Sequence, residues 1–159
     1  MNTPKPLIVI GRAELVRLVD CSEQNLPAKI DTGADISSIW ATAIAEDAAG
    51  LHFTLFDRSS KFYDGRQITI PKGKYRLTRI ANSFGVKELR YVVKLRVEVK
   101  GRIIRASFSL ADRSLKTYPM LLGRRLLKGK FLVDVSRGQA LVEAETDNKV
   151  KLNRDLEKR

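Results

Sequence analysis

The sequence predicts a mostly-β fold, because short apolar and alternating segments recur along it and helical patterns are scarce. The clearest alternation runs through residues 92–99, which read Val-Val-Lys-Leu-Arg-Val-Glu-Val. A period of two is that of a half-buried strand. A turn at residues 100–102 joins this segment to a similar one at residues 103–110, so the pair is expected to form a β-hairpin. Gly and Pro residues separate many of the other short segments, as is typical of connected strands.

Further elements are expected on both sides of this hairpin. The additional strands are predicted at residues 7–10, 15–19, 26–30, 36–40, 53–56, 67–70, 75–80 and 131–135. Residues 124–127 should form one short helix after Gly123, and the alanines of residues 42–49 would allow another turn of helix. Residues 143–159 are charged and poor in apolar side chains, so we expect one domain over residues 1–142 and a flexible C-terminal tail over 143–159.

Length and composition agree with one globular domain. The chain has 159 residues, of which 43% are hydrophobic, enough for a single core. No segment approaches the roughly 20 apolar residues that a membrane-spanning helix needs. The N-terminus lacks a signal-peptide pattern, so we expect a cytoplasmic protein with no membrane contact. Cys21 is the single cysteine, which excludes an intrachain disulfide.

The chain is strongly basic, with a formal net charge of +12. Residues 87–130 hold thirteen Lys and Arg against three Asp and Glu. Such a surface attracts acidic peptides, nucleic acids or anionic surfaces, although the alternation along residues 90–105 also fits the solvated face of a sheet. Aromatic residues make up only 7% of the chain, and the basic stretch lacks the interleaved aromatics that stack bases. Nucleic-acid binding is therefore disfavoured.

The most informative motif is the triplet Asp31-Thr32-Gly33, which directly follows a predicted strand. Alone, the triplet predicts little more than a turn in which the Asp side chain bonds to its own backbone. A second motif lies about ninety residues further on, where residues 119–127 read Pro-Met-Leu-Leu-Gly-Arg-Arg-Leu-Leu. Because the two motifs occur in this order and at this separation, the triplet indicates more than an isolated turn.

Together the motifs resemble those of the retropepsins, the dimeric aspartic peptidases. Residues 28–34, 82–90, 110–113 and 120–134 look more closely similar to a bacterial and archaeal retropepsin-like family that is often labelled ATP-dependent zinc protease. Members of that family are often found beside ATP-grasp ligases that add glutamate to ribosomal proteins. The resemblance spans residues 8–138 and implies a closed retropepsin-like β-barrel.

The resemblance implies an aspartic endopeptidase. Two carboxylates about 3 Å apart share one proton, so that one can act as an acid while the other activates water. The chain has one Asp-Thr-Gly triplet, and the catalytic pair would therefore be Asp31 and the Asp31 of a second copy in a two-fold homodimer. A peptide or protein substrate, acidic if it matches the basic surface, would lie extended across the dimer cleft.

The resemblance also implies roles for residues around Asp31. Thr32, Gly33 and Ala34 would support the active-site loop, with the Thr32 hydroxyl bonding across the dimer axis. Asp35 would form a buried ion pair with Arg124 behind the loop. Asp35 departs from the family pattern, in which a basic residue is expected at this position.

A flap is expected over the substrate cleft, because a turn-forming sequence lies where retropepsins carry a mobile hairpin. Its tip would be formed by Asn82, Ser83, Phe84 and Gly85. The hairpin would close over a bound peptide and exclude water.

No cofactor or metal is expected. A zinc peptidase needs several His, Cys or carboxylate ligands at short spacings, whereas this chain has one His and one Cys, far apart. Two alternatives to peptidase activity are compatible with the sequence. One is a catalytically silent retropepsin fold that serves as a binding or processing partner of a peptide-modifying ligase, and the other is the basic nucleic-acid-binding module.

Overall fold

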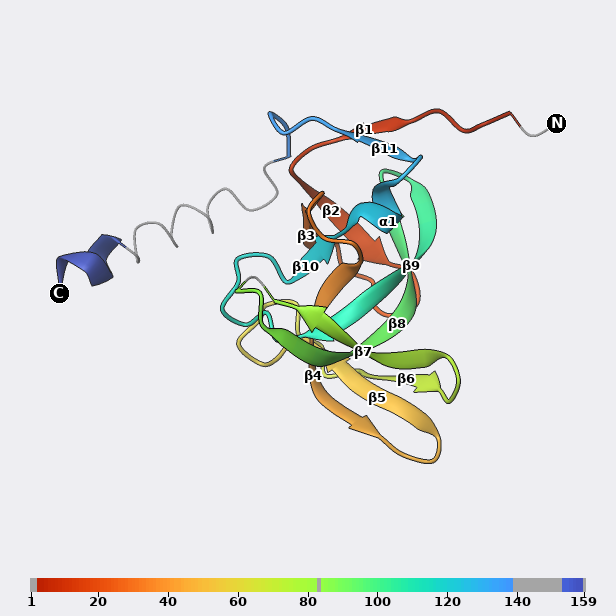
Figure 1. Ribbon diagram of the computed structural model, residues 1–159, viewed down its shortest axis with the longest axis vertical. Coiled ribbons are helices and arrows are strands. Elements are labelled where there is room, and N and C mark those ends of the chain that lie inside the picture. The colour runs from red at the N-terminus through yellow and green to blue at the C-terminus, as the bar shows by residue number, and fades with distance from the viewer. Residues whose placement is uncertain (1–2, 83, 139–152, 159) are drawn as a thin grey trace.

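Strands make up most of the structure, a computed structural model that describes residues 3–82, 84–138 and 153–158 (Figure 1). The elements in chain order are β1 (Ile8–Ile10), β2 (Ala13–Leu18), β3 (Leu26–Ile30), β4 (Ser37–Glu46), β5 (Gly50–Leu55), β6 (Gln67–Pro71), β7 (Tyr75–Ala81), β8 (Lys87–Val99), β9 (Arg102–Ala111), β10 (Met120–Leu122), α1 (Arg124–Leu127) and β11 (Phe131–Val133). The prediction of an all-β chain with a short helix after Gly123 is confirmed.

Six strands pair in a closed ring. The order is β10–β3–β2–β8–β9–β4, and β4 pairs back with β10. Two pairings in the ring, β10 with β3 and β4 with β9, are parallel. Outside the ring, β5 and β6 continue the sheet from β4, β7 pairs with β8, and β1 and β11 form a separate parallel pair. The ring brings β3 and β10, which are distant in sequence, side by side.

The alternation that predicted the central hairpin is also the pattern of burial. In β8, Val93, Leu95 and Val97 are buried while Lys94 and Arg96 are exposed. Most buried apolar side chains of the ring strands belong to one hydrophobic core, whose largest fully buried members include three phenylalanines, Phe53, Phe56 and Phe108. One face of β8 and β9 therefore packs in the core, and the other face carries the charged side chains.

Two expectations about element limits were wrong. The segment 42–49 is not helical: β4 continues through Glu46 with a bulge between Thr42 and Ala45, and it pairs with β5. Tertiary strand pairing overrides the weak helix preference of the alanines. Strand β8 begins at Lys87, five residues before the predicted segment, because residues 87–91 pair with β7.

The C-terminal tail is described only in part. Residues 153–157 form a short helix whose side chains are exposed, but the predicted domain boundary at residues 142 and 143 lies outside the described residues. In the described ranges, no helix is both long and apolar enough to cross a bilayer.

Candidate active site

Asp31 is held at the end of β3 by pairing with β10. Its backbone N–H donates to the carbonyl oxygen of Leu122 at 2.9 Å, which extends the ladder between the two strands by one bond. Its carboxylate oxygen Oδ1 accepts a hydrogen bond of 2.9 Å from the N–H of Gly33. The Asp31 side chain is half-buried, whereas Thr32 and Gly33 are exposed. The fold thus presents the carboxylate at the surface on a fixed backbone.

Two glycines allow the chain to pack closely around this loop. A Cβ on Gly33 would lie 3.2 Å from Oδ1 of Asp31, and a Cβ on Gly123 would lie 2.6 Å from the carbonyl carbon and oxygen of Ile36. The N–H of Gly123 donates to the buried hydroxyl of Ser37 at 3.1 Å. Because the contacts at Gly123 are to backbone, no rotamer change could make room for a side chain there.

The start of α1 is tied to the Asp31 loop by backbone and side-chain bonds. The N–H of Arg124 donates to the carbonyl of Ala34 at 2.7 Å, and the Arg124 guanidinium donates to the carbonyl of Gly33 at 3.0 Å. Arg124 also lies within ion-pair distance of Asp35, at 3.8 Å, but Arg125 makes the shorter contacts with that carboxylate, at 2.9 and 3.1 Å.

The ion pair behind the loop therefore differs from the expectation in two respects. Arg125 rather than Arg124 is the main partner of Asp35. The side chains are also exposed in the single chain, 54% for Asp35 and 66% for Arg125, and an exposed pair contributes little to stability. Arg124 instead braces the loop through its bond to the Gly33 carbonyl.

A cleft of about 860 Å³ lies between the Asp31 loop and the β7–β8 hairpin. Its lining includes Asp31, Gly33 and Ala34 on one side and Ala81, Asn82 and Phe84 on the other. In Figure 1 the same hairpin extends toward the connection between β9 and β10, residues of which also line the cleft. The hairpin proposed as a flap is thus placed beside the carboxylate.

The hairpin tip is a structured turn with an exposed apolar side chain. The Asn82 side-chain oxygen accepts hydrogen bonds from the N–H groups of Phe84 and Val86 at 2.9 and 3.1 Å. Gly85 has φ of 76°, a conformation that favours glycine. Phe84 is 86% exposed, and Ser83 lies outside the described residues. An exposed aromatic at the tip of a hairpin is available to contact a substrate or a second subunit.

The cleft also contains cations that the sequence analysis did not single out. Arg90 and Arg113 line it together with Asp31. Burial and the neighbouring Arg90 lower the pKa of Arg113, and the nearby Asp31 opposes that shift. The Arg113 Nε donates to the carbonyl of Tyr118 at 2.9 Å, which fixes the guanidinium at the cleft wall.

Arg113 could have been found from the sequence, because it is the last residue of segment 110–113, which resembles the retropepsin-like family. The sequence alone did not indicate what this segment does. Within the described part of the chain, no group of three His, Cys, Asp or Glu side chains is arranged to hold a metal ion. The cleft is lined by the Asp31 loop, the β7–β8 hairpin, several cations and the further carboxylates of Asp35, Glu88 and Asp112.

The fold and the two motif segments define a retropepsin-like chain with one Asp-Thr-Gly loop. The chain belongs to the RimB-like family, described as retropepsin-like aspartic endopeptidase RimB, whose model matches residues 9–143. A crystal structure of a Legionella pneumophila protein of unknown function has a TM-score of 0.62 and 25% identity, covering 84% of this chain and 97% of that one.

Two curated relatives are each named probable alpha-L-glutamate ligase. The protein from Parasynechococcus marenigrum is 26% identical over 148 residues, and that from Shewanella pealeana is 29% identical over 141 residues. The matches cover 88% and 85% of this chain but only 30% of each relative. The chain therefore spans about a third of the length of the curated relatives it matches.

Proposed function

We propose that this chain is an aspartic endopeptidase that acts as a two-fold homodimer, with one Asp31 from each copy. The observation that carries the proposal is the half-buried Asp31 carboxylate, which lines a cleft of about 860 Å³ beneath the β7–β8 hairpin. The closed ring of six strands is, in this proposal, the retropepsin barrel that holds the loop. The hairpin is the flap.

The chemistry follows from pairing two like carboxylates. Two carboxylates about 3 Å apart cannot both ionise, so the pair holds one proton and titrates as a unit. The ionised Asp31 takes a proton from a water molecule, whose oxygen attacks the carbonyl carbon of the peptide bond. The other Asp31 gives its proton to the carbonyl oxygen, and a tetrahedral diol forms. Return of a proton to the nitrogen breaks the C–N bond and releases an amine and a carboxylic acid.

The proposed substrate is an acidic peptide. Lys29, Arg76, Arg90, Arg113 and Lys116 line the cleft, and arginine forks bind carboxylates in a bidentate manner. Arg113 is half-buried and makes no ion pair within the described residues, so a substrate carboxylate would pair with it. The relatives named as glutamate ligases support glutamate-rich peptides as the particular class.

The test is cleavage of a library of peptides from about pH 4 to about pH 7, because a carboxylate pair loses its shared proton, and with it the acid of the mechanism, as pH rises. The mass of the protein in solution is measured in the same buffers. Wild type should be a dimer that cleaves acidic peptides, and Asp31→Asn should remain folded and abolish cleavage. Asp112→Asn is the matched control, because Asp112 is another carboxylate of the cleft and should leave most of the activity.

Three results would argue against the proposal. Cleavage that persists in Asp31→Asn would exclude Asp31 as the catalytic group. A monomer at all concentrations would leave Asp31 without its partner. A folded dimer that binds acidic peptides but cleaves none would favour the catalytically silent binding partner.

A further inference from the structure

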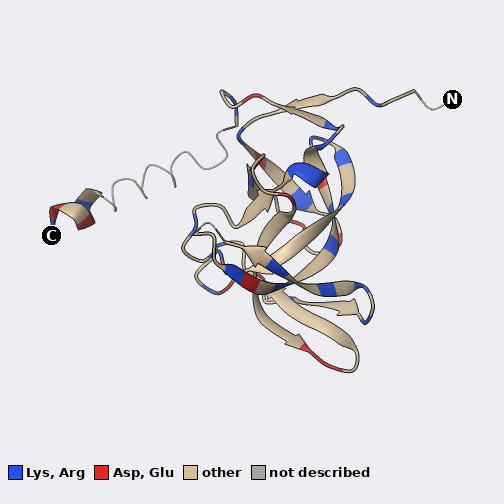
Figure 2. Ribbon diagram, in the orientation of Figure 1, with Lys and Arg blue, Asp and Glu red and all other residues tan. Residues whose placement is uncertain are grey.

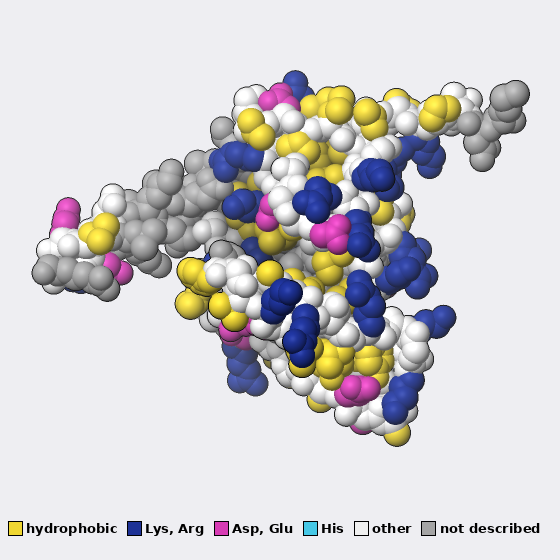
Figure 3. Space-filling model, in the orientation of Figure 1, with side chains coloured by type: hydrophobic (Ala, Val, Ile, Leu, Met, Phe, Trp, Pro, Cys, Tyr) yellow, Lys and Arg dark blue, Asp and Glu magenta, His cyan; other side chains and the backbone are white. Residues whose placement is uncertain are grey.

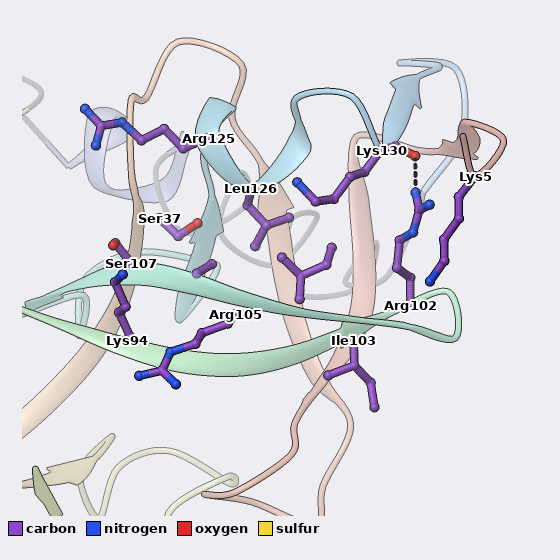
Figure 4. A pocket seen from close by; sticks show the side chains of 12 residues that line it. Lys5, Ser37, Lys94, Arg102, Ile103, Arg105, Ser107, Arg125, Leu126 and Lys130 are labelled. Carbon is purple, nitrogen blue, oxygen red and sulfur yellow. Dashed lines mark hydrogen bonds between the residues drawn. The ribbon is translucent and has the colours of Figure 1, made fainter. Parts of the chain in front are cut away.

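A second, strongly basic hollow lies beside the cleft, lined by other residues apart from Arg125. It has a volume of about 480 Å³ and lies between α1, the β8–β9 hairpin and the N-terminal segment (Figure 4). Six cationic side chains line it and no carboxylate does: Lys5, Lys94, Arg102, Arg105, Arg125 and Lys130. Figure 2 shows basic residues recurring along the same hairpin and on α1. We call this hollow the basic pocket.

The cations of the basic pocket are poorly compensated. Among the described residues, neither Lys94 nor Arg105 makes an ion pair or a side-chain hydrogen bond. Arg105 lies directly opposite Arg96 in the antiparallel register of β8 and β9, and like charges opposite one another destabilise a sheet. Asp20 pairs with Arg96 and also attracts Arg105, so two arginines share one carboxylate. A local arrangement that costs stability is expected where function requires it.

The basic pocket adjoins the cleft. Arg125 lines both hollows, and Ser37 of the pocket and Ser38 of the cleft are consecutive residues of β4. In Figure 4 the side chains of Arg125, Lys94 and Arg105 lie at one end of the pocket, and those of Lys5 and Arg102 lie at the other. An anionic chain that leaves the cleft past Arg125 would therefore meet further cations.

We propose that the basic pocket is an accessory binding site for the carboxylates of an acidic peptide whose scissile bond lies in the cleft. The proposal rests on the proposed function. Arg and Lys suit carboxylates and phosphates alike, but the pocket has no aromatic side chain on which a nucleic-acid base could stack. Peptide is favoured because Arg125 joins the pocket to a peptide-binding cleft, and the site would increase affinity for long acidic chains over short ones.

The experiment measures binding of fluorescent oligoglutamate peptides to the full chain. An extended peptide advances about 3.3 Å per residue, so a peptide of about four residues spans only the cleft and one of about sixteen can reach both sites. The pocket variant is Lys94→Glu with Arg105→Glu. It should fold, since Lys94 and Arg105 are both exposed and a glutamate at position 105 lies opposite Arg96.

The control variant is Lys72→Glu with Lys74→Glu, in the turn between β6 and β7. It makes the same change in net charge, and neither residue lines the basic pocket or the cleft. At physiological salt the screening length is about 8 Å, so distant charges should matter little. We expect the pocket variant to bind the long peptide about tenfold more weakly, to bind the short peptide like wild type, and to cleave short acidic substrates at the wild-type rate.

Several outcomes would overturn the proposal. Equal losses in the pocket and control variants would show a diffuse effect of net charge. Unchanged binding of the long peptide would show that the pocket is not used. Tighter binding of a single-stranded RNA of similar length, lost in the pocket variant, would assign the pocket to nucleic acid. If the peptidase proposal is wrong but the pocket proposal is right, wild type would bind the long peptide through the basic pocket without cleaving any peptide.

Discussion

Replacement of Gly123 by alanine tests whether the close contact between α1 and the Asp31 loop holds the candidate site. The added Cβ would lie 2.6 Å from the carbonyl carbon and oxygen of Ile36 and 2.9 Å from the carbonyl oxygen of Ala34. Overpacking typically costs about 1–3 kcal/mol. If the displaced backbone also loses the buried bond to Ser37, a further cost of about 1–3 kcal/mol follows. We therefore expect Gly123→Ala to lower the free energy of unfolding by about 2–6 kcal/mol when both costs apply.

The measurement is denaturant unfolding of the full chain, with Gly101→Ala as a control. Gly101 has φ of 76° and open space around its Cβ position. Alanine there meets no steric contact and lowers the free energy of unfolding only through the strain of the left-handed backbone conformation, by about 1–2 kcal/mol. Gly123 has φ of −93°, which any residue adopts, so its cost is steric alone. A loss at Gly123 no larger than that at Gly101, with peptide cleavage retained, would refute the argument that this contact positions the loop.

Three further predictions concern other groups. Arg113→Met should raise KM for acidic peptides about tenfold while leaving KM for neutral peptides nearly unchanged, and equal effects on both would contradict a role in recognising carboxylates. Hydrogen bonds from Tyr75 and Tyr91 hold the pKa of Glu46 below its ordinary 4.5. The ionised Glu46 therefore adds to the free energy of unfolding above pH 4.5, and this contribution is lost as pH falls through the folded-state pKa. Unfolding midpoints measured against pH should therefore fall less steeply on the acid side in Glu46→Gln than in wild type. Burial raises the pKa of the Cys21 thiol to about 11, so maleimide at mildly alkaline pH should label it only after unfolding, and rapid native labelling would show that the thiol is accessible.

The parts of the fold that local pattern determines were predictable from the sequence. The alternation of residues 92–99 became the inward and outward faces of β8, and the short helix expected after Gly123 became α1, whereas strand β10 was not predicted. These features depend on side-chain period and on a glycine that permits close packing, and both are visible in sequence. The helix considered for residues 42–49 was wrong because residues 42–46 pair instead with β5, the next strand along the chain, and this pairing outweighs the weak helix preference of the alanines.

The partners of charged side chains were harder to predict. Arg124 and Arg125 are consecutive, and the direction in which each points from α1 decides that Arg125 makes the shorter contacts with Asp35. Arg113 belongs to the connection between β9 and β10, and its position at the cleft depends on a bond to the Tyr118 carbonyl. The excess of cations was evident from composition, but its spread over the molecular surface (Figure 3) and its concentration in two hollows follow from the closed ring.

The exposed state of the Asp31 loop is itself an argument for a second subunit. Thr32 and Gly33 are exposed, and the ion pair of Asp35 with Arg125 is open to solvent in the single chain, where it contributes little. A two-fold partner that covers this surface would exclude water from the pair and strengthen the electrostatic interaction between its members. The same contact would bring the second carboxylate next to the first. Assembly and formation of the catalytic pair would then be one event, so the proposed activity should depend on protein concentration in the same way as dimer formation does.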